Sequence, residues 1–206
     1  MNHEEFQRQV DVSRETFERL EAYVALMKKW NSAINLVSPS TISQIWSRHI
    51  LDSAQIYELA PEKPNMWCDM GSGGGLPALV VSIMSKDAHP ELSMICIESD
   101  LRKATFLRTV ARELDLQLTV RSERIEKVEP LSADVLSARA LAPLEALCGF
   151  AERHLRPGGV AIFPKGENYR QEVHEALENW SFQLDTYPSK THPSAVILKI
   201  GEISRV

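Results

Sequence analysis

The N-terminal part of the chain carries apolar side chains at helical spacing. They recur at steps of three and four after Ser13, and serine is a residue type that caps helix N-termini. A second run keeps the same period from Ile42 to Leu59, and the segment PEKPN (residues 61–65) ends it. The pattern therefore predicts helices followed by a linker. The positions in the first run are Phe17, Leu20, Tyr23, Val24, Leu26, Met27, Trp30 and Ile34.

Beyond Asn65 the pattern changes, and short apolar runs alternate with helical periods. Such alternation is typical of a mostly parallel, doubly wound α/β sheet. The last two apolar runs are separated by PSKTHP (188–193), which is too short for a crossover helix, so we expect a hairpin and one antiparallel strand. We predict a helical extension over 1–64 and a seven-stranded core over 65–206. The predicted strands are 66–70, 92–98, 117–121, 133–138, 160–164, 182–187 and 195–200, and the predicted helices are 76–84, 101–114, 143–155 and 169–180.

A glycine-rich loop, CDMGSGGGLP (68–77), directly follows the first predicted strand. In open α/β sheets ligands bind at the carboxyl ends of the strands, and glycines there let the backbone approach a ligand closely. A triphosphate loop would need a lysine after its last glycine, but Leu76 and Pro77 follow here. A dinucleotide fingerprint that begins at Gly71 would need its third glycine at Leu76. Both of these ligand classes therefore fit poorly.

Two acidic residues flank this loop. Asp69 stands two residues before Gly71, and Glu98 ends the second predicted strand, where an acid can accept hydrogen bonds from both ribose hydroxyls. Two acids and no lysine in the loop suit a ligand that carries a ribose and a positive charge. S-adenosylmethionine has both.

Composition limits the classes of protein that the chain could be. It has 206 residues and a net charge of −5, which disfavours a dedicated nucleic-acid binder but allows a local basic face. The acidic start MNHEEFQRQV does not resemble a signal peptide, and no stretch approaches the roughly 18 apolar residues of a membrane span. Cys68, Cys96 and Cys148 lie in apolar surroundings, so we expect reduced core cysteines in a cytoplasmic protein.

Seven segments occur in the order and spacing of one known family. The chain resembles the ribosomal RNA small subunit methyltransferase G family, also called glucose-inhibited division protein B, over nearly its whole length. Ser72 and Gly74 stand where that family is expected to have threonine and proline, and Glu98 replaces a frequent aspartate. The segments are KWNSAINLVS (29–38), RHILDS (48–53), DMGSGGGLPA (69–78), RKATFLRTV (102–110), SERIE (122–126), SARALAPL (137–144) and FPKG (163–166).

The resemblance implies a Rossmann-like class I methyltransferase fold that uses S-adenosylmethionine. It implies transfer of a methyl group to N7 of guanosine 527 in the 530 loop of 16S rRNA. The partner would be that rRNA, in the small subunit or in an assembly intermediate, and we expect a monomer. The expected cofactor-binding residues are Asp69, Gly71, Ser72, Gly73, Gly75, Leu76, Glu98, Ile125, Glu126 and Arg139.

N7 methylation agrees with the residue chemistry. Guanine N7 carries a lone pair and no proton, so the enzyme needs no general base and must chiefly align the reactants, which can contribute roughly 7–11 kcal/mol. Carbon-5 cytosine methylation would need an active-site cysteine, and amino-group methylation commonly uses an Asp/Asn-Pro-Pro-aromatic motif; the fourth predicted strand is followed by neither. By resemblance, Arg139 orients the guanine, and an arginine reads guanine O6 well. Lys165 is expected to meet a phosphate, and these two are the predicted catalytic residues.

Several positions leave more than one interpretation open. Asn35, His49 and Asp52 belong to the helical extension, which the resemblance places over the cofactor pocket. For His49 and Asp52 we favour a packed or hydrogen-bonded pair over a metal site, and we predict no metal. A non-catalytic sensor that binds the cofactor and a nicotinamide oxidoreductase remain alternatives. The hypothesis for the RNA-facing surface joins Arg139 and Lys165 to Arg102, Lys103, Arg108, Arg112, Arg121 and Arg124.

Overall fold

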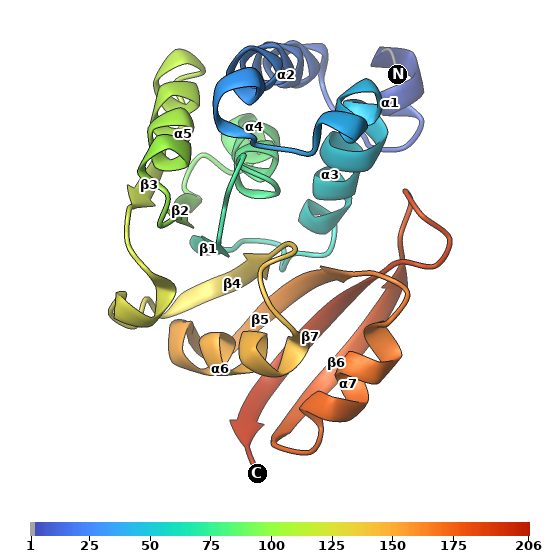
Figure 1. Ribbon diagram of the computed structural model, residues 1–206, viewed down its shortest axis with the longest axis vertical. Helices are drawn as coiled ribbons and strands as arrows, with labels where there is room; N and C mark the ends of the chain where they lie inside the picture. The colour runs from blue at the N-terminus through green and yellow to red at the C-terminus, as the bar shows by residue number, and fades with distance from the viewer. Residues whose placement is uncertain (1–2) are drawn as a thin grey trace.

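The computed structural model describes residues 3–206 and contains seven strands in one sheet (Figure 1). All seven predicted strands are present, and their order in the sheet is β3-β2-β1-β4-β5-β7-β6. Strand β7 runs antiparallel to both neighbours and the other pairs are parallel, which confirms the predicted fold class. The strands are β1 (Met66–Met70), β2 (Ser93–Ile97), β3 (Leu118–Arg121), β4 (Ala133–Ala138), β5 (Leu155–Lys165), β6 (Trp180–Pro188) and β7 (Val196–Arg205).

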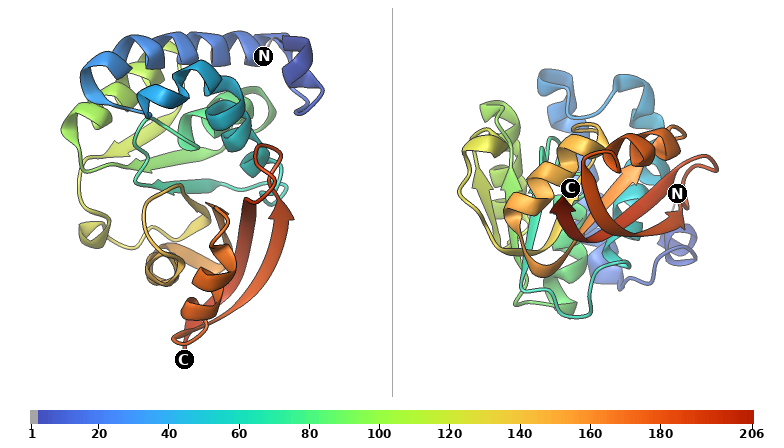
Figure 2. Two further views of the ribbon diagram at one scale, coloured as in Figure 1. Left: turned by 45° about the vertical axis from the view of Figure 1, so that its right-hand side comes forward. Right: turned by 90° about the horizontal axis from the view of Figure 1, so that it is seen from below.

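Helices cover both faces of this sheet (Figures 1 and 2). Helices α4 and α5 connect β1, β2 and β3 on one face, and α6 and α7 lie on the other. Each face has its own apolar cluster, so the sheet is buried between two layers. The helices are α1 (His3–Gln7), α2 (Arg14–Ile34), α3 (Asp52–Tyr57), α4 (Ala78–Ala88), α5 (Leu101–Glu113), α6 (Leu144–His154) and α7 (Tyr169–Ala176), with the short helices η1 (Pro39–Gln44), η2 (Trp46–Leu51) and η3 (Ile125–Lys127).

Some element ends differ from the sequence-based prediction. β5 begins at Leu155, so the segment that we expected to precede the strand, residues 155–159, already belongs to it. Helix α7 ends at Ala176 rather than 180, because Trp180 is buried as the first residue of β6. The terminal hairpin is also longer than predicted, since β7 continues to Arg205. These ends depend on strand pairing, which local apolar patterns do not report.

The N-terminal helices form an outer layer over α4 and α5 (Figure 2). Helix α2 begins as predicted at the Ser13 cap, whose Oγ accepts a hydrogen bond from the Thr16 amide at 3.1 Å. It ends at Asn35, which adopts a left-handed conformation with φ 45°. Asn35 therefore serves as a helix C-cap.

The second predicted helix is wrong in its local form. Residues 39–57 contain a 3-10 helix, a π-helical segment and then helix α3, rather than one α-helix. Three consecutive side chains of η2, those of His49, Ile50 and Leu51, are buried. Single-turn π segments occur often at functional sites.

Candidate active site

The carboxyl ends of β1, β2 and β4 meet at one edge of the sheet. Met70 pairs with Ile97 on one side and with Ala138 on the other. The residues that follow these three positions are Gly71, Glu98 and Arg139, so parallel pairing brings them to the same edge. The chain leaves β1 toward β2 and later returns to add β4 on the opposite side, which makes this edge the topological switch point. A ligand crevice is expected at such a point.

The glycine loop joins β1 to α4 through backbone conformations that favour glycine. Gly71, Gly73 and Gly75 have φ values of 65°, 54° and 86°. A Cβ at Gly75 would overlap the buried side chain of Leu79 on α4. The amide of Gly71 also donates to the carbonyl of Ile97 at 2.8 Å, which ties the loop to β2. The loop is therefore held as a fixed backbone cradle.

At Gly74, packing rather than backbone conformation explains the absence of a side chain. This residue lacks a positive φ, but a Cβ there would lie 3.2 Å from the Cβ of Leu36, just beyond helix α2. The buried hydroxyl of Tyr23 donates to the Gly74 carbonyl at 2.6 Å. Close packing against the N-terminal extension, rather than contact with a ligand, therefore explains the bare backbone at this position. Gly74 was not among the predicted cofactor-binding residues, and nothing in the sequence indicated this contact.

Asp69 lies beneath the loop with its side chain fully enclosed. Its Oδ1 accepts a hydrogen bond from the Ser137 hydroxyl at 2.6 Å, and that hydroxyl accepts one from the Trp67 indole N–H at 2.9 Å. Oδ2 is buried and has no hydrogen-bond partner among residues 3–206. Burial raises the pKa of Asp69 to about 6, although the Ser137 hydrogen bond and the positive charge of Arg139 oppose that rise. Asp69 lines neither of the two clefts described below, so its expected contact with the cofactor stays a prediction.

Glu98 is held by backbone amides at the end of β2. Its Oε2 accepts a hydrogen bond from Gly73 N–H at 2.8 Å, and its Oε1 accepts one from Asp100 N–H at 2.7 Å. An ionised carboxylate has about four acceptor positions, so two remain for the hydroxyls of a ribose. Glu98 is therefore oriented before any ligand arrives, and it also fixes the glycine loop.

A cleft of about 410 Å³ opens beside the loop and Glu98. Its volume lies in the range of small-molecule pockets, roughly 300–1,000 Å³. Of the predicted cofactor residues, Gly71, Gly73, Glu98, Ile125 and Glu126 line it. Helix η3 supplies the last two of these. Asp69, Ser72, Gly75 and Leu76 are buried or nearly so next to the loop, where they support its backbone.

A second and larger cleft lies on the other side of residues 140–142. It has a volume of about 1,140 Å³, and Ala140, Leu141 and Ala142 line both clefts. Ala140 has a positive φ of 52°, which is uncommon for a residue with a side chain. The walls of the second cleft come from the N-terminal extension, the end of β5, helix α7 and the β6–β7 hairpin.

Arg139 lines the second cleft rather than the first. Its guanidinium is held by residues of the N-terminal extension. Nη1 and Nη2 each lie 3.2 Å from His49 Nδ1, and Nη1 lies 3.4 Å from Asp52 Oδ2. His49 and Asp52, which we expected to pair, thus both contact the guanidinium of Arg139. Their proximity to Arg139 could not be read from the sequence, since about 90 residues separate them.

Lys165 sits at the end of β5 but is not a free cation. Its side chain is 9% exposed, and Nζ lies 2.6 Å from Glu172 Oε2 and 3.0 Å from the carbonyl of Ala142. The same Glu172 oxygen accepts the Leu144 amide at 2.9 Å. Lys165 and Glu172 therefore brace the segment between the two clefts. The phosphate contact expected for Lys165 stays a prediction, and the sequence carried no signal for Glu172.

The predicted basic residues lie mainly along α5 and the β3 edge of the sheet. Arg102, Arg112, Arg121 and Arg124 are exposed. Arg108 is also exposed and donates to Ser122 Oγ at 2.6 Å. Lys103 and Arg124 line the cofactor-side cleft, so this surface reaches its rim.

The three cysteines are buried free thiols. Burial raises the pKa of the Cys148 thiol to about 12 and raises the pKa values of Cys68 and Cys96 as well. The thiolate is the nucleophilic form, so none of the three is suited to attack a base. Carbon-5 cytosine methylation, which would need an active-site cysteine, is therefore disfavoured.

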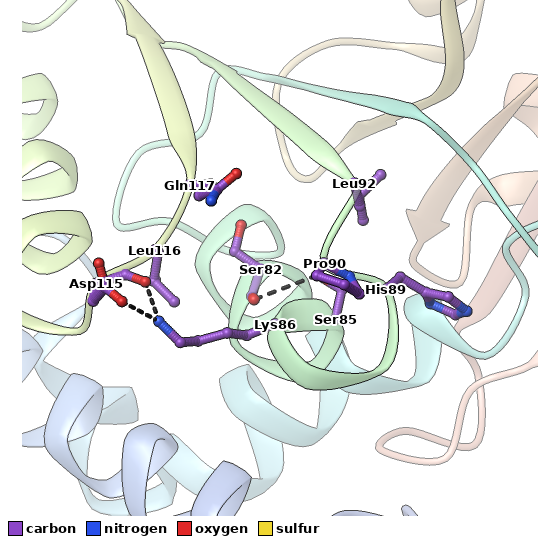
Figure 3. A pocket seen from close by; sticks show the side chains of 9 residues that line it. All are labelled: Ser82, Ser85, Lys86, His89, Pro90, Leu92, Asp115, Leu116 and Gln117. Atoms are coloured by element: carbon purple, nitrogen blue, oxygen red, sulfur yellow. Dashed lines mark hydrogen bonds and ion pairs between the residues drawn. The ribbon is translucent and has the colours of Figure 1, made fainter.

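Another small pocket lies at the opposite edge of the sheet (Figure 3). It has a volume of about 150 Å³ and is lined by the end of α4 and by residues that precede β2 and β3. Its one lysine, Lys86, lies 2.9 Å from Asp115 Oδ2 and is already paired. Because it lies at the amino ends of the strands, it is not where ligands of open α/β sheets bind.

Within residues 3–206, no group of three or more His, Cys, Asp and Glu side chains could hold a metal ion. Within the same range, no helix is long and apolar enough to cross a membrane.

The fold matches that of known methyltransferases. A SAM-dependent methyltransferase from Aquifex aeolicus has a TM-score of 0.58 at 11% identity, covering 86% of this chain and 96% of that one. TYW2 from M. jannaschii, solved in complex with AdoMet, has a TM-score of 0.57 at 14% identity, covering 79% and 78%. At these identities the likeness shows the fold alone, which is that of the class I S-adenosylmethionine-dependent methyltransferases, and the glycine cradle and the oriented Glu98 lie where such a fold places a ligand.

Sequence comparison narrows the class to one family. A family model described as rRNA small subunit methyltransferase G matches residues 16–195. The Ribosomal RNA small subunit methyltransferase G of Ruegeria pomeroyi is 51% identical over 197 residues, covering 96% of each chain. The chain belongs to the rRNA small subunit methyltransferase G family. It is therefore a methyltransferase with S-adenosylmethionine as its cofactor, and the oxidoreductase and sensor alternatives are set aside.

Proposed function

We propose that this enzyme methylates N7 of guanosine 527 in 16S rRNA. One observation carries the proposal: Arg139 lines a large cleft that adjoins the cofactor-side cleft along a shared wall, residues 140–142. An arginine in that position can donate two hydrogen bonds to the O6 and N7 edge of a guanine, or to O6 alone while N7 reacts. A volume of about 1,140 Å³ leaves room for a base and its flanking nucleotides.

The reaction needs positioning more than proton transfer. Bound S-adenosylmethionine supplies an electrophilic methyl group, and N7 offers a lone pair without losing a proton. The acidic side chains at the Arg139 and Lys165 ends of the second cleft are engaged. Asp52 contacts Arg139, and Glu172 contacts Lys165. This pairing supports a mechanism without a general base, in which the chain aligns the base and excludes water.

The residues toward the cofactor have separate roles. Glu98 would accept hydrogen bonds from the ribose, and Asp69 would face the positively charged end of the molecule. Ile125 and Glu126 would border the adenine, and the glycine loop would lie against the backbone of the ligand. Arg139 would orient the guanine on the far side of residues 140–142.

The exposed arginines of α5 and β3 would receive the RNA backbone. They form a local basic face on a chain whose net charge is −5. Neutralising phosphates releases counterions, so affinity for small subunits should fall steeply as salt rises. Affinity that does not change between low and moderate salt would remove this surface from the proposal. We further propose that the enzyme acts as a monomer in the cytoplasm on a small subunit or its precursor.

The variant Arg139→Ala tests the proposed role of the arginine. Transfer of tritiated methyl groups to small-subunit rRNA should fall by about 100-fold, because the guanine loses its orientation. Arg14→Ala is a matched control, since Arg14 is exposed on α2 and pairs with Glu18. Full activity of Arg139→Ala would refute the role, and mass spectrometry that finds no added methyl group with the wild-type protein would refute the activity.

A further inference from the structure

The guanidinium of Arg139 is positioned by a part of the chain that lies outside the methyltransferase sheet. Arg139 follows β4, but its contacts are with the π-helical segment η2 and the start of α3. Besides His49 and Asp52, its Nη1 reaches the carbonyl of Arg48 at 3.5 Å. The Arg139 side chain is 21% exposed and that of Asp52 is 17% exposed, so water competes little for these contacts.

The hydrogen bonds around His49 have only one consistent direction. A guanidinium can only donate, so His49 Nδ1 must accept from Arg139. The other ring nitrogen, Nε2, lies 2.8 Å from Thr41 Oγ1. The Thr41 hydroxyl donates its own proton to the carbonyl of Ser38 at 2.8 Å, so its oxygen is left to accept from Nε2–H. A directed chain thus runs from Arg139 through His49 and Thr41 to Ser38.

The charges that face His49 agree with that direction. Arg139 and Arg48 are both cationic, and Asp52 is the acidic group that shares Arg139 with it. Burial, together with the charges of Arg139 and Arg48, lowers the pKa of His49 to about 4. The imidazole is therefore neutral near pH 7, and a lone pair is available at Nδ1.

Asp52 is fixed by the turn between β6 and β7 and by its own helix α3. Its Oδ1 accepts hydrogen bonds from the hydroxyl of Thr191 at 2.9 Å and from Gln55 Nε2 at 3.0 Å. Thr191 lies in the turn between β6 and β7. The other carboxylate oxygen of Asp52, Oδ2, is left to face Arg139. The Arg139 guanidinium thus contacts an imidazole and a carboxylate. Each of these two groups is also held by a threonine hydroxyl, which fixes the atom that it presents to Arg139.

We propose that His49 is a positioning residue for Arg139, and that Thr41 sets its tautomer. The Nε2–H form presents a lone pair to the guanidinium, and the Nδ1–H form would present a proton to it and push it away. Through Arg139, this tautomer determines how the guanine is oriented for methyl transfer. The inference rests on the proposed function in its last step, but the tautomer itself is a property of the chain without RNA.

The matched pair Thr41→Val and Thr41→Ser separates tautomer control from packing. Valine has nearly the shape of threonine but no hydroxyl, and serine keeps the hydroxyl. In single-turnover assays Thr41→Val should transfer methyl groups roughly tenfold more slowly, because a small displacement of an aligning group lowers the rate. Calorimetric affinity for S-adenosylmethionine should stay within twofold of wild type in both variants, and Thr41→Ser should keep nearly the wild-type rate. Equal rates for the two variants would overturn the proposal.

Nitrogen-15 NMR of the imidazole supplies a readout that does not depend on catalysis. Without RNA, His49 should be a fixed, neutral Nε2–H tautomer at pH 7 in the wild type and in Thr41→Ser. Thr41→Val removes the acceptor of Nε2–H, so its ring should lose the hydrogen-bonded Nε2–H signal and show averaged nitrogen shifts. A wild-type Nδ1–H or doubly protonated ring would overturn the proposal. If instead the wild type methylates no RNA while the tautomers behave as expected, the proposed function fails and the positioning of Arg139 by His49 stands.

Discussion

The two clefts that share residues 140–142 differ in the parts of the chain that line them. The cofactor-side cleft is made largely of backbone that joins strands to helices: a glycine loop, amides that hold Glu98, and the short helix η3. The larger cleft is made of side chains that come from the N-terminal extension, α7 and the terminal hairpin. The second cleft also draws on the N-terminal extension, which lies outside the sheet. Its walls therefore come from segments that lie farther apart in the sequence than those of the first cleft.

Gly75→Ala should break the first cleft most severely. A methyl group would overlap Leu79, and the positive φ would become strained, so we expect a loss of roughly 2–4 kcal/mol in the free energy of unfolding. Urea denaturation measures this directly. Gly166→Ala is the matched control, because nothing lies within 4 Å of its added Cβ and its effect should be within about 0.5 kcal/mol. Equal stability of the two variants would show that the loop is less rigid than its geometry indicates.

Glu98→Ala should weaken binding of S-adenosylmethionine by about 100-fold in calorimetry. It removes the expected acceptor for the ribose and frees the Gly73 amide, and hydrogen bonds to a charged group contribute about 1.5–3 kcal/mol each. Affinity for small subunits should not change, since the second cleft is left intact. Glu91→Ala, at an exposed site before the same strand, should bind like wild type. Wild-type affinity for Glu98→Ala would remove this residue from the cofactor site.

Lowering the pH should change the free energy of unfolding through Asp69 and through His49, with opposite signs and a small net effect. The pKa of Asp69 is raised from 3.8 to about 6, so its contribution to stability is present below pH 3.8 and is lost as pH rises through about 6. The pKa of His49 is lowered from 6.5 to about 4, so its contribution is present above pH 6.5 and is lost as pH falls toward 4.

Variants should expose the two opposing contributions. Between pH 7 and pH 5, Asp69→Asn should lose more unfolding free energy than the wild type, and His49→Asn should lose less. Denaturation curves at both values measure the difference. If both variants follow the wild-type pH dependence, Asp69 and His49 do not make opposite contributions to the free energy of unfolding.

The sequence predicted the first cleft better than the second for a physical reason. The glycine loop and Glu98 each follow a buried strand, so one apolar pattern both locates the strand and places the residue at its end. The packing of Gly74 against Leu36 could not be predicted from this pattern, because Leu36 comes from another layer. The seven strands followed from the same pattern, although the ends of β5 and β7 did not.

The second cleft depends on contacts that no local pattern reports. Arg139 and Lys165 were located by the strands they follow, but their partners were not. His49 faces Arg139 across about 90 residues of sequence, from a π-helical segment where the apolar pattern predicted a regular helix. Glu172 meets Lys165 because α7 folds back over the end of β5. The residues that contact Arg139 and Lys165 were therefore identified only from the structure.

Mapping of 7-methylguanosine in small-subunit rRNA tests the central claim most directly. Chemical cleavage at that nucleotide would be compared in cells that carry the wild-type protein, no protein, or Arg139→Ala. We predict cleavage at guanosine 527 with the wild-type protein, none without it, and strongly reduced cleavage with the variant. Cleavage at guanosine 527 that persists without the protein, or a methyl group found elsewhere in the rRNA, would contradict the account.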